Sequence, residues 1–235
     1  YEAQGLFHPF LGRNAVRNDF SVSDRNFYII TGANMAGKST FLRSLGINYV
    51  LAMNGMPVFA NRLTLSRFKL FTSMRTTDDL THGISYFNAE LLRLKQIIDA
   101  ISPVKSVNNK PAQSRDEKMV STETDSLPSG ENRNDVSKSR GATLIILDEI
   151  LKGTNSEDKL SGSRMFLEYV ANRNVTGVIA THDLKLSAMT DEYPDRFHNF
   201  CFEIALGTDV TYTYKITPGV ARNQNATFLL NKLLH

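Results

Sequence analysis

The residues most able to do chemistry form a glycine-rich segment near the amino end of the chain. Residues 32–40 read Gly-Ala-Asn-Met-Ala-Gly-Lys-Ser-Thr and follow the pattern G-x-x-x-x-G-K-[ST]. The apolar residues 27–30 before it predict a buried strand, and the apolar spacing over residues 41–51 after it predicts a helix. A strand, a glycine loop and a helix in this order are typical of a phosphate-binding loop. We therefore predict that the chain binds a nucleoside triphosphate.

The positions of this segment have predicted roles toward the triphosphate. Backbone N–H groups and the helix N-terminus would hold the phosphates. Lys38 would reach the β- and γ-phosphates, and the Ser39 hydroxyl would ligate Mg²⁺. Asn34 would offer its amide to the γ-phosphate, with a plain turn-forming role as the alternative. The predicted nucleotide-binding residues of the loop are Gly32, Asn34, Met35, Ala36, Gly37, Lys38, Ser39 and Thr40.

Two acidic residues end a second apolar segment. Residues 143–147 predict a buried strand, and Asp148 and Glu149 follow it directly. Acids often end strands for structural reasons alone, but beside a phosphate-binding loop they indicate hydrolysis of the triphosphate. Asp148 would then hold Mg²⁺ through water, and Glu149 would polarise the attacking water. We predict Glu149 and Lys38 as catalytic residues and Asp148 and Ser39 as metal ligands.

Two further segments are candidates for the same site. His182 follows the apolar residues 177–180, at the edge where open α/β sheets bind ligands, and would report the γ-phosphate as a third catalytic residue. The alternative is a solvated histidine. Residues 153–163 are rich in small and hydroxylated residues and lead into a predicted helix, which indicates a second anion site. We assign this segment, including Ser161, to a triphosphate held by another copy of the chain; a plain helix cap is the alternative.

Composition excludes several classes of protein. The chain has 235 residues, 41% hydrophobic and 22% charged, as is ordinary for a soluble globular protein. The formal net charge of +3 gives no basic field for nucleic acid, and a lone cysteine, Cys201, fits a reducing, cytoplasmic location. Since no stretch approaches the roughly 20 apolar residues that span a bilayer, we expect no membrane contact from this segment. The chain starts at Tyr1 without methionine, so we expect it to be part of a longer polypeptide.

The remaining pattern predicts one domain over residues 1–235. We expect edge strands at 5–11 and 18–22, further strands at 58–60 and 65–71, and an antiparallel pair at 197–206 and 210–217. Helices are predicted at 85–101, with Ser85 as N-cap, at 157–172, and at 223–234, and residues 74–83 form a surface loop. The segment from about residue 104 to residue 140 is rich in polar and charged residues, which predicts a mobile insertion. Alternatively, this insertion contacts DNA or a partner protein.

Together these segments resemble the carboxy-terminal ATPase domain of the MutS family of DNA mismatch-repair proteins. Residues 31–40 are close to the family's T-G-P-N-M-G-G-K-S-T, and residues 78–90 are similar to its D-D-L…S-x-F-x-x-E. Residues 147–161 resemble D-E-I-x-x-G-T…D-G-x-S, and residues 180–182 resemble A-T-H. Residues 219–230 are similar to the family's closing helical dimerisation element. The resemblance covers nearly the whole chain outside the predicted insertion.

The resemblance implies an α/β fold of the ABC-type P-loop NTPase class. A mixed, mostly parallel central sheet would be flanked by helices, with antiparallel edge strands and a C-terminal helical dimerisation element at about 218–235. It also implies ATP and Mg²⁺ as cofactors and a homodimer with two composite ATP sites, in which ATP switches a clamp around DNA. DNA contact would come from domains outside this segment, since the sequence shows no DNA-reading element.

The sequence also departs from the family pattern. Lys159 stands where the family usually has glycine, Leu151-Lys152 replaces Gly-Arg, and the insertion falls where the family has a short connection. For adenine stacking only nearby candidates can be named: Phe7, His8 and Phe10. These differences indicate a divergent branch and leave open a MutS-related ATPase without mismatch specificity, acting as a scaffold or tethered to a membrane. A transporter subunit is disfavoured, because its L-S-G-G-Q signature precedes the acidic strand, whereas the similar segment here follows it.

Overall fold

The computed structural model describes residues 1–74, 86–102, 142–206 and 210–222. Its centre is a six-stranded sheet in the order β5-β6-β7-β3-β8-β9. The first five of these strands run parallel, and β9 runs antiparallel to β8. Their bounds are β3 (Phe27–Gly32), β5 (Lys69–Ser73), β6 (Thr143–Asp148), β7 (Val175–Ala180), β8 (Phe197–Leu206) and β9 (Val210–Pro218). The predicted mixed, mostly parallel sheet with an antiparallel edge is confirmed.

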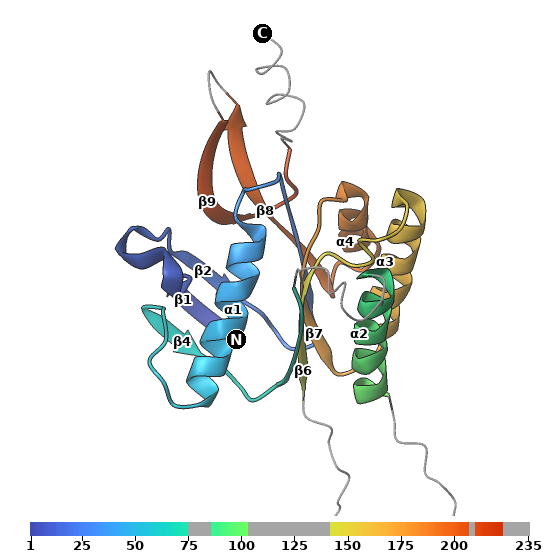
Figure 1. Cartoon of the computed structure of the whole chain (residues 1–235), viewed down its shortest axis with the longest axis horizontal. Coiled ribbons are helices and arrows are strands. Elements are labelled where there is room, and N and C mark those ends of the chain that lie inside the picture. The colour runs from blue at the N-terminus through green and yellow to red at the C-terminus, as the bar shows by residue number, and fades with distance from the viewer. Residues whose placement is uncertain (75–85, 103–141, 207–209, 223–235) are drawn as a thin grey trace, which may run out of the picture.

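Different elements cover the two faces of this sheet (Figure 1). On one side lie α1 (Lys38–Met53) and a three-stranded antiparallel sheet with the order β2-β1-β4. The strands of that small sheet are β1 (Glu2–Leu6), β2 (Asn18–Ser21) and β4 (Arg62–Thr64), and a 3-10 helix, η1 (Pro9–Asn14), follows β1. On the other side lie α2 (Tyr86–Ile101), α3 (Ser156–Ala171), η3 (Leu184–Ala188) and α4 (Met189–Glu192).

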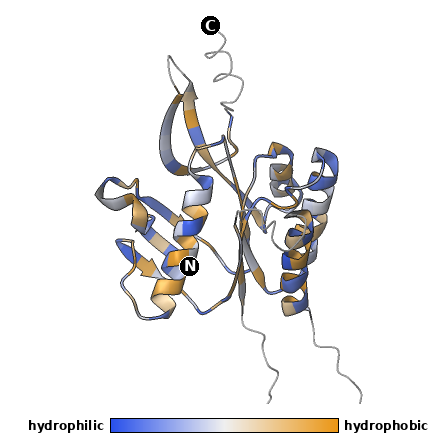
Figure 2. Cartoon of the chain, in the orientation of Figure 1, coloured by the Kyte–Doolittle hydropathy of each residue, from blue (hydrophilic) through white to orange (hydrophobic). Residues whose placement is uncertain are grey.

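The central strands divide their side chains between two hydrophobic clusters. Successive residues of a strand point to opposite faces, so that Tyr28 and Ile30 of β3 join the cluster under α1, whereas Phe27 and Ile29 join the cluster under α2 and α3. Residues buried on both faces explain why the sequence of β3 is a continuous apolar run. Helices α2 and α3 mix hydrophobic and hydrophilic residues, as expected of helices that cover a sheet (Figure 2).

The parallel register brings three strand ends to one edge of the sheet. Ala180 of β7 pairs with Ile30 of β3 on one side and with Asp148 of β6 on the other. Two backbone bonds continue this alignment beyond the strands: Glu149 donates to the Ala180 carbonyl at 2.9 Å, and Thr181 donates to the Ile30 carbonyl at 2.9 Å. The glycine loop (residues 32–40), the acidic end of β6 and the segment after β7 therefore start side by side.

Three predicted strands differ from the structure, for local reasons. The strand predicted at 5–11 ends at Leu6, because Pro9 lacks an N–H and begins η1, which His8 caps by accepting from Phe10 N. The strand predicted at 58–60 is instead β4 at 62–64, because the Phe59 N–H donates to the Asn48 side chain. The strand predicted at 65–71 begins only at Lys69.

The late start of β5 has its own cause. Both the N–H and the carbonyl of Phe68 bond to the hydroxyl of Tyr49 on α1, each at 2.7 Å, so neither is available to a strand ladder.

Several predictions fall outside the described residues. They are the helix N-cap at Ser85, the insertion at 104–140, the helix at 223–234 and nearly all of the loop at 74–83. Of the C-terminal element at 218–235, only residues 218–222 are described. Within the described residues, no helix combines the length and the apolar character needed to cross a membrane.

Candidate functional site

The glycine loop has a backbone that requires glycine at both ends. Gly32 and Gly37 have φ angles of 154° and 112°, which side-chain-bearing residues rarely adopt. A Cβ on Gly32 would also lie 2.9 Å from the Phe202 carbonyl oxygen of β8. Gly37 is the N-cap of α1 and has no side chain to satisfy the first N–H groups of the helix. The loop therefore presents backbone N–H groups at a helix N-terminus, which is a ready site for an anion.

Lys38, the first residue of α1, folds back over this loop. Its side chain is buried, and Nζ donates to the carbonyl oxygens of Gly32 at 2.6 Å and Ala33 at 2.9 Å. Burial lowers the pKa of Lys38 to about 8, partly offset by the carboxylates of Glu149 and Asp148, which raise it. The side chain is thus still mostly cationic at pH 7, and its ammonium group lies against backbone carbonyl oxygens of the loop.

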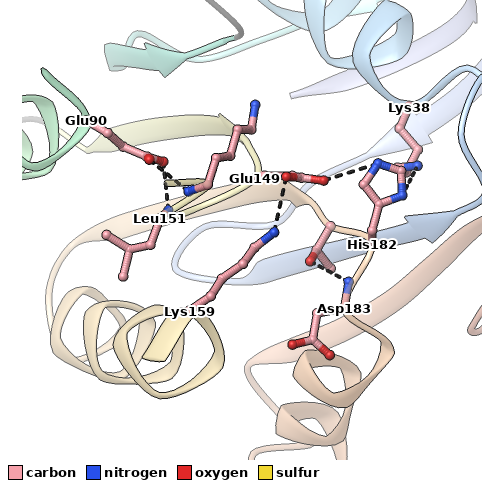
Figure 3. A network of polar contacts seen from close by, with 9 residues as sticks. Lys38, Glu90, Glu149, Leu151, Lys159, His182 and Asp183 are labelled. Carbon is pink, nitrogen blue, oxygen red and sulfur yellow. Dashed lines mark hydrogen bonds and ion pairs between the residues drawn. The ribbon is translucent and has the colours of Figure 1, made fainter. Parts of the chain in front are cut away.

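His182 links Lys38 to the acidic end of β6 (Figure 3). Lys38 Nζ lies 3.3 Å from His182 Nδ1, and His182 Nε2 lies 3.1 Å from Glu149 Oε1. Since an ammonium group can only donate, Nδ1 must accept and Nε2 must carry the proton that faces the carboxylate. The pKa of His182 is lowered by burial and then by the charge of Lys38, which agrees with this neutral ring.

Glu149 is held from a second side by α3. Lys159 Nζ lies 3.2 Å from Glu149 Oε2, and both side chains are largely removed from solvent. The backbone of Glu149 has a φ of 66°, which turns the chain sharply after β6. Its carboxylate therefore lies between His182 and Lys159, as Figure 3 shows.

A buried carboxylate from α2 supports the turn after Glu149. Glu90 accepts from the backbone N–H groups of Leu151 at 2.7 Å and Lys152 at 2.9 Å. Leu151 itself has a φ of 57°, so the turn contains two residues in the left-handed region. In the sequence, Glu90 belongs to a segment similar to a family motif, but no role was predicted for it. No spacing rule connects it with Leu151, which lies 61 residues away.

These groups surround one cavity of about 550 Å³. The glycine loop contributes residues 33–40, and the acidic and histidine segments contribute Asp148, Glu149 and His182. Gly32 is not among the described residues that line the cavity, but its carbonyl accepts from Lys38, which does line it. The structure thus brings together the predicted site residues of the loop, of the end of β6 and of the segment after β7. Ser161 is exposed on α3 and is not among the described residues that line the cavity.

Aromatic residues form another part of the wall. Phe7 and His8, two of the three named candidates for adenine stacking, line the cavity together with Phe202 and Tyr214. Phe10 is 89% exposed and is not among the described residues lining the cavity. Tyr214 was not predicted, because it reaches the cavity through long-range contacts: β9 pairs with β8, and the Tyr214 carbonyl accepts from the Asn18 side chain at 3.1 Å.

The oxygen donors predicted for Mg²⁺ suit that ion. Ser39 lies in the first turn of α1, and Asp148 is a buried carboxylate at the end of β6; both line the cavity. Mg²⁺ prefers hard oxygen ligands and keeps several waters, which a hydroxyl, a carboxylate and an open cavity allow. When bound, the ion would offset phosphate charge between these two residues.

The start of α3 has a packing role that the sequence did not reveal. A Cβ on Gly162 would lie 2.4 Å from Leu151 Cδ1, and a Cβ on Gly153 would lie 3.0 Å from Phe87 Cβ. Asn155 caps the helix by accepting from Asp158 N at 2.9 Å. Small residues here therefore serve packing and capping within one chain, and the role toward a second copy stays a prediction.

Comparisons with known proteins agree with the resemblance. Residues 28–107 match the family model described as MutS domain V. The chain is 29% identical over 225 residues to the DNA mismatch repair protein MutS of Thermotoga petrophila, covering 94% of this chain and 24% of that protein. It is 26% identical over 232 residues to the human MutS protein homolog 4, covering 93% and 22% of the two chains. A similar match, 29% over 226 residues, is found with DNA mismatch repair protein MutS 2 of Halobacterium salinarum, covering 93% of this chain and 22% of that one. The chain thus spans about a quarter of the length of these relatives.

Proposed function

We propose that this chain is the Mg²⁺-dependent ATPase module of a MutS-like DNA mismatch-repair protein, with the ABC-type P-loop NTPase fold. The convergence of three strand ends on one cavity carries the proposal. It places the cation of Lys38, the carboxylates of Asp148 and Glu149 and the ring of His182 around a glycine loop. The match of residues 28–107 to MutS domain V supports the same assignment.

Each residue has a distinct task in the proposed reaction. Lys38 exchanges its loop carbonyls for the β- and γ-phosphate oxygens, which compensates for its burial. Glu149 accepts a hydrogen bond from the water that attacks the γ-phosphate in line, and the carboxylate thereby orients that water. His182 leaves Lys38 and donates to the γ-phosphate, so that it registers the loss of this group. Ser39 and Asp148 hold Mg²⁺.

The active form is proposed to be a homodimer with composite ATP sites. The start of α3, with Ser161 exposed, would face the triphosphate bound by the glycine loop of a second copy. Residues 218–235 would add a second contact between the copies. Contact with DNA would come from parts of the protein beyond this segment, in keeping with the names of the relatives, two of which are DNA mismatch repair proteins.

A second candidate is a MutS-related ATPase without mismatch specificity, as a scaffold or a membrane-tethered protein. The departures at Lys159 and Leu151-Lys152 favour it, since they fall on or directly before the segment that we propose to face the triphosphate of the second copy. Both candidates share the ATPase site and differ in what the site controls. An ABC-transporter subunit is the least favoured alternative, because of the order of its motifs.

The variant Glu149→Gln tests the proposed site. The amide keeps the shape of the side chain but is a far weaker base, so we expect ATP binding to persist while hydrolysis slows by roughly 10²–10⁴-fold. Trapped ATP should then hold two chains together, and gel filtration with Mg²⁺ and ATP should show a dimer.

The control is Glu168→Gln, on the exposed side of α3, where the carboxylate makes a weak ion pair with Arg164 at 3.6 Å. This change should leave hydrolysis at the wild-type rate. A Glu149→Gln chain that binds ATP but stays monomeric at every concentration would refute the composite site. Unchanged hydrolysis would refute the role of Glu149.

A further inference from the structure

The ion pair between Lys159 and Glu149 is unusual in its burial. The two side chains are 19% and 14% exposed, and the two charged atoms are 3.2 Å apart. The ion pair between Lys95 and Asp99 on α2 is shorter, at 2.6 Å, but its side chains are 68% and 61% exposed. Solvent screens the second pair strongly and the first one weakly. Of these two lysines, Lys159 is therefore the one able to restrain the carboxylate that it contacts.

Lys159 is the outer member of a continuous row of four side chains. Lys159 contacts Glu149, Glu149 contacts His182, and His182 contacts Lys38, with distances of 3.2, 3.1 and 3.3 Å. Both carboxylate oxygens of Glu149 are engaged, one by each neighbour. Figure 3 shows the histidine ring between Glu149 and Lys38.

This row keeps the proposed base from its water. Lys38 marks where the β- and γ-phosphates would lie, and the attacking water must sit between those phosphates and Glu149 within hydrogen-bond reach of both. The ring of His182 occupies that interval. A bound triphosphate would draw Lys38 and His182 away, but it would not displace Lys159, which approaches Glu149 from α3 and is not among the described residues that line the cavity.

We propose that Lys159 is a positioning residue that holds the Glu149 carboxylate in a non-hydrolysing arrangement until the start of α3 engages a second copy of the chain. This inference rests on the proposed ATPase function and adds a control element to it. Lys159 lies in the first turn of α3, the part of the chain proposed to face the partner's triphosphate, and an ammonium group there has a phosphate as its competing partner. Moving to that phosphate releases Glu149, so hydrolysis follows pairing of the copies.

The test compares Lys159→Met with Lys95→Met under single-turnover conditions, at chain concentrations where gel filtration shows monomers. Methionine keeps the length of the side chain and removes the charge. We expect Lys159→Met to hydrolyse bound ATP about fivefold faster than the wild type, a factor that corresponds to a modest ion pair. ATP affinity should be unchanged, because Lys159 lies outside the cavity. Lys95→Met loses an exposed ion pair and should hydrolyse ATP at the wild-type rate.

Two further variants separate restraint from folding. Lys159→Arg retains the positive charge and should hydrolyse at a rate closer to the wild type than to Lys159→Met. The double variant Lys159→Met/Glu149→Gln should be as slow as Glu149→Gln alone, which shows that the gain acts through Glu149. Thermal unfolding of every variant shows whether a change in the hydrolysis rate comes with a change in the stability of the fold.

Each other outcome overturns the inference. If Lys159→Met hydrolyses ATP more slowly than the wild type, Lys159 supports catalysis. If its rate equals that of Lys95→Met, the ion pair between Lys159 and Glu149 has no influence on hydrolysis. These two results leave the ATPase proposal intact. Failure of the wild type to bind or hydrolyse ATP would overturn the ATPase proposal itself, together with the restraint. A rate that Glu149→Gln does not alter would refute the role of Glu149 and, with it, the restraint by Lys159.

Discussion

The glycine loop and the acidic end of β6 face the same cavity but are built in different ways. Lys38 bonds to carbonyls five and six residues earlier, so the loop is organised mostly by its own backbone. Glu149 depends on Lys159 of α3 and on His182 after β7, and the turn that carries it depends on Glu90, which bonds to residues 61 and 62 positions later. One half of the site is local in sequence, and the other is assembled by packing.

This difference indicates how the two halves respond to change. The loop should bind phosphate wherever a strand and a helix hold its ends, because its donors are backbone groups. The acidic half should respond to movements of α2 and α3, since its contacts come from those helices. We therefore expect ATP binding and ATP hydrolysis to be separable by mutation.

Lys38→Ala should abolish measurable ATP binding at micromolar concentrations. The change removes a charge-assisted contact to two phosphates, worth about 3 kcal/mol or roughly 100-fold in affinity. Isothermal titration with ATP and Mg²⁺ measures the loss. Lys95→Ala, on the exposed face of α2, is the control and should bind as the wild type does. Normal binding by Lys38→Ala would show that the loop holds no triphosphate.

Glu90→Ala should damage the acidic half and spare the loop. It leaves the N–H groups of Leu151 and Lys152 without their acceptor in a buried turn, and we expect a loss of about 2–3 kcal/mol in the free energy of unfolding. Urea denaturation measures the stability. The rate of ATP hydrolysis should fall, whereas the affinity for ATP should stay within a few-fold of the wild-type value. An equal loss of both would contradict the separation of the halves.

Gly37→Ala should damage the loop and spare the turn. The φ of 112° strains any residue with a Cβ, and that Cβ would lie 3.2 Å from Tyr214 Cδ1. We expect a cost of roughly 1–3 kcal/mol, seen as weaker ATP binding together with a lower unfolding temperature. Gly55→Ala is the matched control, because its φ of 68° is also left-handed but no atom lies within 4 Å of its Cβ. Equal ATP affinities for the two variants would mean that the loop conformation is not needed for binding.

ATP binding should weaken at alkaline pH through Lys38. Burial lowers the pKa of this ammonium to about 8, so the free chain loses the proton as pH rises above that value. Phosphate favours the charged form, so binding above pH 8 must be accompanied by proton uptake. We expect affinity to fall about tenfold between pH 7 and pH 9, with heats that depend on the ionisation enthalpy of the buffer. A flat profile over this range would indicate that Lys38 stays charged in the free chain.

The outcome of the sequence predictions follows the same division. The strands and helices around the loop and the strand that ends in Asp148 were placed correctly, because buried strands leave continuous apolar runs and helices leave apolar residues at helical spacing in the sequence. The strand predicted at 65–71 started late, because the hydroxyl of Tyr49 takes both backbone groups of Phe68, a contact that spans 19 residues. The roles of Glu90 and Tyr214 were missed for the same reason, since both reach the site through packing.

The sequence by itself determined the glycine loop, the acids that end β6 and the order of strands and helices, because turns, capping and apolar periodicity act over a few residues. Tertiary structure decided which residues approach the Glu149 carboxylate. Lys159 looked like a departure from a family motif in the sequence, and in the folded chain it is a partner of Glu149. Such pairings depend on how α3 packs against the sheet, and a side-chain contact between separate elements leaves no periodic signal in the chain.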